Sequence, residues 1–207
     1  MFGAGFAKKV IDEVNKLRAD PAPLSKKITE YMSYFKGKIL TLPKEAGIET
    51  AEGKDAYKEA ADFLSKAPKL PELKVNPLLM KIAEEMVAEM KKCKDEAEMD
   101  KINRNAIIKK HGHYDGRLSD STDYGSLTPQ MVVINLIVDD GNKSRSNRKL
   151  LYRDDFKEIG VANAVHDDLN TITHLVFATD FSEGPGKMDD VLLPYEEEQL
   201  KQQQAAK

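Results

Sequence analysis

The stretch that decides the fold runs from residue 127 to residue 181. It begins LTPQMVVINLIVDDGNKSRSNRKLLYRDDFKEIGVA (127–162) and ends FATDF (177–181). Thr128 is a typical helix N-cap and Pro129 is typical of the first helical position. The apolar side chains that follow predict a helix with a broad face suited to packing on a sheet; they are Val132, Val133, Leu136 and Ile137.

Two β-rich runs close this stretch. IGVANAV (159–165) and ITHLVFA (172–178) are rich in β-branched residues, and the turn-forming HDDLN (166–170) joins them. Their close spacing predicts an antiparallel hairpin. A basic polar segment, residues 142–148, lies between the helix and the hairpin, after a turn at DDG (139–141).

The residues before this stretch predict mainly helices. Apolar residues at helical spacing indicate a helix over residues 4–18, and another after Pro23. A short helix should carry Tyr57 and Leu64, and a further helix should begin at Pro77 with Asn76 as its N-cap.

The remaining segments carry weaker patterns. Residues 37–53 lack periodicity and predict a loop, whereas residues 91–110 predict a continuation of the preceding helix with a charged surface. Residues 111–127 are rich in His, Gly, Asp and Ser, which favours a polar loop. The tail, residues 182–207, is too polar to form a core of its own.

The composition limits the class of protein. A chain of 207 residues with 41% hydrophobic residues suits one domain, and a net charge of −3 argues against nucleic acid as a partner. No apolar run approaches the roughly 18 residues needed to span a bilayer, and the one at the N-terminus is too short for a secretory signal. Cys93 is the single cysteine, so no internal disulfide can form. We therefore expect a cytoplasmic protein.

Together these motifs resemble the CAP superfamily, which includes cysteine-rich secretory proteins, antigen 5 and plant pathogenesis-related 1 proteins. Many members read as a hydrophobic helix, then Asp-Asp-Gly, Ser-Arg-Gly-His-Arg, Gly-Val-Ala and Phe-Ala. The resemblance spans most of the chain and is most specific after Thr128. It implies an α+β fold, a three-layer α-β-α sandwich with a small, mainly antiparallel sheet. Residues 1–181 would form this domain, with an extra helical segment at about 91–110 and the tail 182–207 appended.

The resemblance also implies a cleft with two histidines and usually two acidic residues, which binds a divalent metal such as zinc in some members. His113 corresponds to the first histidine, whereas the second falls on Asn147, and an amide oxygen is a poor zinc ligand. No glutamate occurs between Glu98 and Glu158, so neither acidic residue has a glutamate counterpart there. The resemblance therefore implies a degenerate site, and we assign no catalytic residue.

Three functions remain open at this point. The first is a non-catalytic structural or protein-interaction component of an intracellular assembly, for example a cytoskeletal or ciliary one, that binds partners through the tail or segment 91–110. The second is a metal-dependent hydrolase in which His111, His113 and a carboxylate such as Asp115, Asp120 or Asp123 rebuild a zinc site. The third, implied by the resemblance alone, is a module that binds a sterol or fatty acid. The first interpretation requires no cofactor.

Overall fold

The computed structural model of the chain describes residues 4–184, which form helices interleaved with strands. The helices are α1 (Ala4–Ala19), α2 (Ala22–Tyr31), the short 3-10 helix η1 (Met32–Tyr34), α3 (Lys54–Lys66), α4 (Pro77–Met90), α5 (Glu96–Met99), α6 (Arg104–His111), α7 (Pro129–Val138) and α8 (Ser146–Leu151). The strands are β1 (Phe35–Lys36), β2 (Ile39–Leu40), β3 (Ile48–Glu49), β4 (Lys74–Val75), β5 (His113–Tyr124), β6 (Glu158–His166) and β7 (Asn170–Ser182). None of the helices in this range combines the length and the apolar character that a membrane span requires.

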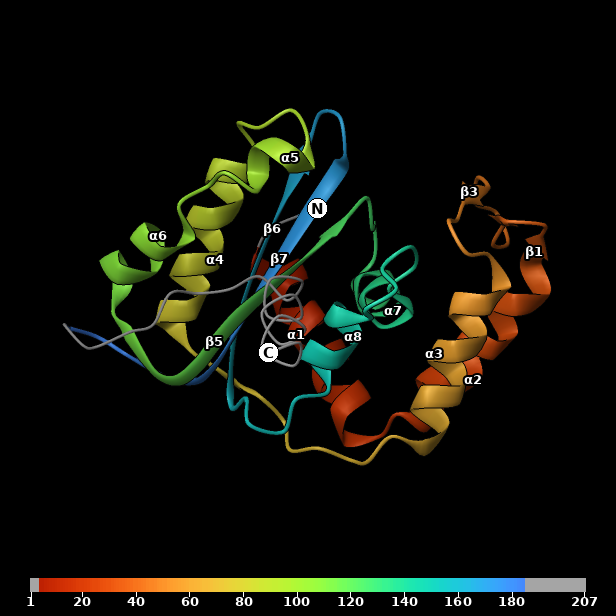
Figure 1. The fold of residues 1–207 in the computed structure, drawn as a ribbon, viewed down its shortest axis with the longest axis horizontal. Coiled ribbons are helices and arrows are strands. Elements are labelled where there is room, and N and C mark those ends of the chain that lie inside the picture. The colour runs from red at the N-terminus through yellow and green to blue at the C-terminus, as the bar shows by residue number, and fades with distance from the viewer. Residues whose placement is uncertain (1–3, 185–207) are drawn as a thin grey trace, which may run out of the picture.

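A four-stranded sheet in the order β4-β6-β7-β5 forms the middle layer. The short strand β4 is parallel to β6, whereas the other neighbours are antiparallel. Helices α4, α5 and α6 lie on one side of the sheet, and α1, α7 and α8 lie on the other (Figure 1). The predicted hairpin and the predicted α+β sandwich are both confirmed.

Each face of the sheet carries its own apolar core, because side chains alternate along a strand. On β7, Leu175 and Phe177 join the core that α1, α2, α3, α7 and α8 build. Ile172, Val176 and Ala178 join the other core, which α4, α5 and α6 cover. The sheet is therefore buried from both sides.

Local signals positioned several of these elements correctly. The Asn76 side chain accepts hydrogen bonds from the backbone N–H of Leu78 and Leu79 at 2.8 and 3.4 Å, as expected for an N-cap, and Pro77 opens α4. The same side chain donates to Glu158 Oε2 and to the Phe181 carbonyl, so it also ties α4 to the sheet. Thr128 caps α7 through the N–H of Met131.

Gly160 on β6 allows α4 to lie directly against the sheet. A Cβ atom at this position would lie 2.1 Å from the Leu79 carbonyl carbon and 2.5 Å from the Met80 nitrogen. Since these are backbone atoms, no side-chain rotation can relieve the overlap. Only glycine permits this close approach of helix and strand.

The structure corrects three predictions. The continuous helix over 91–110 is wrong: α4 ends at Met90, and the segment is helical only in α5 and α6. The polar loop over 111–127 is also wrong, because β5 is a twelve-residue strand paired with β7. Residues 37–53, predicted as a loop, contribute β2 and β3 to a small antiparallel sheet with β1. The tail from residue 185 onward lies outside the described residues.

Candidate functional site

A cleft of about 390 Å³ lies beside the end of β5. Six elements and the turn after α7 contribute its walls, and most of the groups they present are carboxylates, amides and hydroxyls. The lining residues are Ile48, Glu49 and Thr50 at β3, Tyr57 on α3, Glu96 on α5, Thr122, Asp123 and Tyr124 on β5, Met131, Asn135, Leu136 and Val138 on α7, Asp139, Asp140 and Asn142 after it, and Asn147 on α8.

Asp123 is the most unusual of these groups. Its side chain is 4% exposed, and Asn135 Nδ2 donates a hydrogen bond to its Oδ1 at 3.1 Å. Its Oδ2 has no hydrogen-bond partner among the residues that the structure describes. Burial raises the pKa of this carboxyl to about 7, although hydrogen bonds from Ser126 and Asn135 oppose the shift. A buried acceptor without a partner is costly, so its position beside a cleft is informative.

A second carboxylate, Asp139, organises the opposite wall. Asn147 donates to it from its side chain at 2.8 Å and from its backbone at 2.9 Å, and the Asn142 side chain donates as well. Burial raises the pKa of Asp139, and the hydrogen bonds from Asn147 and Asn142 counteract that effect. The Ser121 hydroxyl donates to Asn147 Oδ1 at 2.7 Å, which links this wall to β5. The Asn147 amide thus donates one hydrogen bond and accepts another, which fixes its orientation.

Two arginines form ion pairs and hydrogen bonds next to this wall. Arg145 forms ion pairs with Glu52 and Glu59 at 2.6 and 2.7 Å, and Arg148 shares Glu59 at 2.7 Å. These hydrogen bonds raise the pKa of Arg145 and lower that of Glu52 to about 2. Arg148 also donates to the last two carbonyls of α7. Both arginines are therefore already paired with glutamates that lie outside the lining of the cleft.

The charge of the cleft is one-sided as a result. Five carboxylate side chains line it, whereas lysine, arginine and histidine are absent from the lining; the five are Glu49, Glu96, Asp123, Asp139 and Asp140. None of them forms an ion pair with another residue of the range 4–184. Hydrogen bonds compensate part of this charge: Asp140 accepts from the N–H groups of Ala51 and Glu52. The cleft therefore attracts positive charge.

A hydroxyl–imidazole pair lies at the edge of the cleft. Thr122 Oγ1 lies 2.8 Å from His174 Nδ1, and His174 Nε2 lies 3.6 Å from Asp120 Oδ2. Arg104 Nε lies 3.5 Å from the same Asp120 oxygen. His174 is 1% exposed, and burial lowers its pKa to about 4; the Asp120 charge opposes this shift and the Arg104 charge adds to it. Its imidazole is therefore neutral and weakly basic at physiological pH.

The site residues inferred from the sequence do not gather in one place. Asn147 lines the cleft, but His113 is at the opposite end of β5, eight residues before Ser121, which is about 26 Å along a strand. His113 Nδ1 lies 3.1 Å from the Gly184 carbonyl oxygen, and His111 Nε2 lies 2.8 Å from Glu85 Oε2. Asp115 is exposed.

Within the described residues no three His, Cys, Asp or Glu side chains are arranged to hold a metal ion. Carboxylates and amides occupy the cleft, while His111 and His113 contact other partners. The donor set needed for a zinc site with these histidines is therefore not assembled in the part of the chain that the structure describes.

Sequence reasoning missed Asn135 and Asn142 and treated Asp139 only as a turn residue. The run SDSTDY (119–124) offered no periodic signal, because Asp120 and Thr122 between Ser119, Ser121 and Asp123 are polar as well. Ser119, Ser121 and Asp123 are nevertheless all buried.

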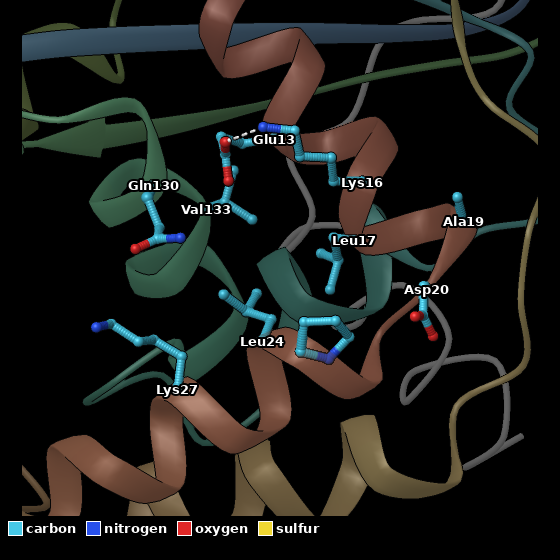
Figure 2. Close-up of a pocket in the computed structure, with 10 residues that line it drawn as sticks. Glu13, Lys16, Leu17, Ala19, Asp20, Leu24, Lys27, Gln130 and Val133 are labelled. Carbon is cyan, nitrogen blue, oxygen red and sulfur yellow. Dashed lines mark hydrogen bonds and ion pairs between the residues drawn. The ribbon is translucent and has the colours of Figure 1, made fainter.

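A second hollow, of about 560 Å³, lies between α1, α2 and α7 (Figure 2). Its rim carries both charges, Glu13 and Asp20 against Lys16 and Lys27, and Glu13 pairs with Lys16 at 2.7 Å. Leu17, Leu24 and Val133 form its floor. Because its charges are balanced and none of its lining groups is a buried polar atom without a partner, we favour the cleft at β5.

Comparisons with known proteins show only distant structural similarity. No family model matches the sequence, and no curated protein matches it. An outer surface protein from Borrelia burgdorferi is 18% identical with a TM-score of 0.41, over 63% of this chain and 96% of that one. A cysteine-rich secretory protein from Staphylococcus aureus is 17% identical with a TM-score of 0.40, over 75% of this chain.

This chain spans about half, 49%, of the staphylococcal protein. At this level of similarity, the function of the cleft has to be argued from its own side chains.

Proposed function

We propose that this protein is a non-catalytic, CAP-like interaction module that binds a protein partner through the cleft at the end of β5. The observation that carries the proposal is the fixed hydrogen-bonding wall of Asp139, Asn142 and Asn147, held by Arg145 and Arg148. Polar groups that are already oriented lose little entropy when a ligand binds, which favours recognition.

The rim of the cleft supports a protein as the ligand. Ile48 is 49% exposed at its edge, and Met131 and Leu136 add apolar surface to its wall. Apolar surface beside oriented polar groups is the usual composition of a site for a peptide segment. The single cysteine and its inability to form an internal disulfide are consistent with an intracellular assembly as the setting.

The hydroxyl–imidazole pair of Thr122 and His174 argues less strongly for catalysis. A general base works best when its pKa lies near the working pH. Since burial lowers the pKa of His174 to about 4, this imidazole would remove a proton from Thr122 poorly. A buried cross-strand hydrogen bond explains the pair adequately, because Thr122 and His174 lie opposite each other in the sheet.

Site-specific cross-linking tests the proposal. A photoreactive amino acid in place of Ile48, at the rim, should capture a discrete partner in the cells that produce the protein, whereas the same group in place of Lys81, on the exposed side of α4, should not. Identical products from the two positions would contradict the proposal.

Zinc loading tests the alternative function. The protein should retain no stoichiometric zinc after desalting. Zinc that is retained by the wild type and lost on His113→Ala would instead support the metal-dependent hydrolase.

A further inference from the structure

The cleft at the end of β5 combines two independent features. Its lining carries five carboxylates and no basic side chain, and none of the five is in an ion pair within residues 4–184. Separately, Asp123 Oδ2 is buried beside that cleft and has no hydrogen-bond partner in the same range of residues. An acidic surface alone would say little, but a carboxylate oxygen that the fold leaves unsatisfied requires a partner from elsewhere.

We propose that the cleft receives the cationic side chain of a lysine or arginine from a basic segment of the protein partner, and that Asp123 is its ion-pair acceptor. This inference rests on the proposed function and specifies the chemistry of the partner. The four other carboxylates that line the cleft attract the cation, and Asp123 binds it where water is largely excluded.

The distribution of hydrogen bonds around the two buried carboxylates favours Asp123 over Asp139 as the acceptor. Asn147 and Asn142 already donate to both oxygens of Asp139, and the backbone of Asn147 adds a further donor. Asp123 receives the Asn135 donor on Oδ1, whereas its Oδ2 has no hydrogen-bond partner within residues 4–184. A single free oxygen suits an ammonium group or one N–H of a guanidinium, so lysine and arginine both fit.

The ring of groups around Asp123 provides the rest of the subsite. Asn135 Nδ2 is bonded to both Asp123 and the Ser126 hydroxyl, at 3.1 and 2.9 Å, so this amide holds the carboxylate in place. Ile48 and Met131 provide apolar surface for the aliphatic stem of a lysine or arginine, which packs well against such side chains.

Binding of small probes to the full chain tests the proposal by NMR at about pH 7.5. N-acetyl-arginine amide and N-acetyl-lysine amide should shift the side-chain amide signals of Asn135 and Asn147 saturably. N-acetyl-citrulline amide, which matches arginine in shape but is neutral, should bind at least about tenfold more weakly. Equal binding of the citrulline probe would overturn the proposal.

Two variants identify the acceptor. Asp123→Asn should weaken binding of the arginine probe at least about tenfold, because it removes the charge and keeps the shape. Asp115→Asn is the matched control, since Asp115 is an exposed aspartate on the same strand and lies outside the cleft, and it should leave binding unchanged. Unchanged binding by Asp123→Asn would refute the role of Asp123.

A peptide separates a protein partner from a free polyamine. An acetylated Leu-Arg-Leu-Gly amide should bind more tightly than N-acetyl-arginine amide, and Ile48→Ser should remove that gain. Spermidine that binds more tightly than the peptide would overturn the choice of a protein segment. If the Ile48 cross-link forms but the cationic probes do not bind, this inference fails while the proposed function stands.

Discussion

Replacement of Asp123 by asparagine should stabilise the protein at alkaline pH and have little effect at acid pH. Burial raises the pKa of this carboxyl from 3.8 to about 7, so the folded protein holds the proton more tightly than the unfolded chain does. The stability linked to that proton is complete below the unfolded pKa and is lost as the pH rises through about 7. Asparagine has the shape of the protonated acid and never ionises.

The expected magnitude follows from the two pKa values. At about 1.36 kcal/mol for each pKa unit, the wild type loses about 2.6 kcal/mol relative to Asp123→Asn between about pH 5 and about pH 8. In a chain of this size that difference corresponds to a shift of roughly 5–10 °C in Tm. The advantage at pH 8 arises because asparagine removes an ionised group from a site that is 4% exposed.

Urea denaturation of the wild type, Asp123→Asn and Asp115→Asn at both pH values measures this difference. Asp115 is exposed, so Asp115→Asn should show the pH dependence of the wild type. The reasoning is refuted if Asp123→Asn changes the free energy of unfolding equally at the two pH values, or if it is the less stable protein at pH 8.

Three further substitutions test the packing that positions the cleft. Gly160→Ala should lower the free energy of unfolding by about 3 kcal/mol or more in urea denaturation, because its Cβ would overlap the backbone of α4. The control Gly5→Ala should be neutral or stabilising, since a Cβ at Gly5 meets open space. Asn76→Ala should cost about 2 kcal/mol on the same measure, since the N-cap and two bonds to the sheet are lost. Arg148→Met should lower the free energy of unfolding by about 3–5 kcal/mol, because the carbonyls at the end of α7 lose their donors. We therefore expect Arg148→Met to be more destabilising than Asn76→Ala, and the reverse order would contradict this reasoning.

The sequence predicted those elements whose local signals agree with their tertiary setting. Thr128-Pro129 and Asn76-Pro77 marked helix starts correctly, and the β-branched runs marked the hairpin. In each case the local preference and the burial of the apolar side chains favour the same structure. Agreement of this kind is what makes a prediction from one sequence dependable.

Strand β5 could not be predicted in the same way. Its buried face carries Ser119, Ser121 and Asp123 where most strands carry apolar side chains, so hydrophobic periodicity gave no signal. Pairing with β7, which is distant in sequence, determines its conformation. The cleft was hidden for the same reason, because its walls come from seven segments that only the tertiary fold brings together.

The sheet separates most of the two apolar cores, with Met80 of α4 packing against the core on the other side, and this has a consequence for how the chain can vary. The middle strands separate the two cores, since Phe177 packs in one core and Val176 packs in the other. Repacking of α6 should reach the wall formed by α7 and α8 only by displacing α4 or the strands. Helix α6 contributes no residue to the cleft, so its length can change while ligand recognition on the far side stays intact.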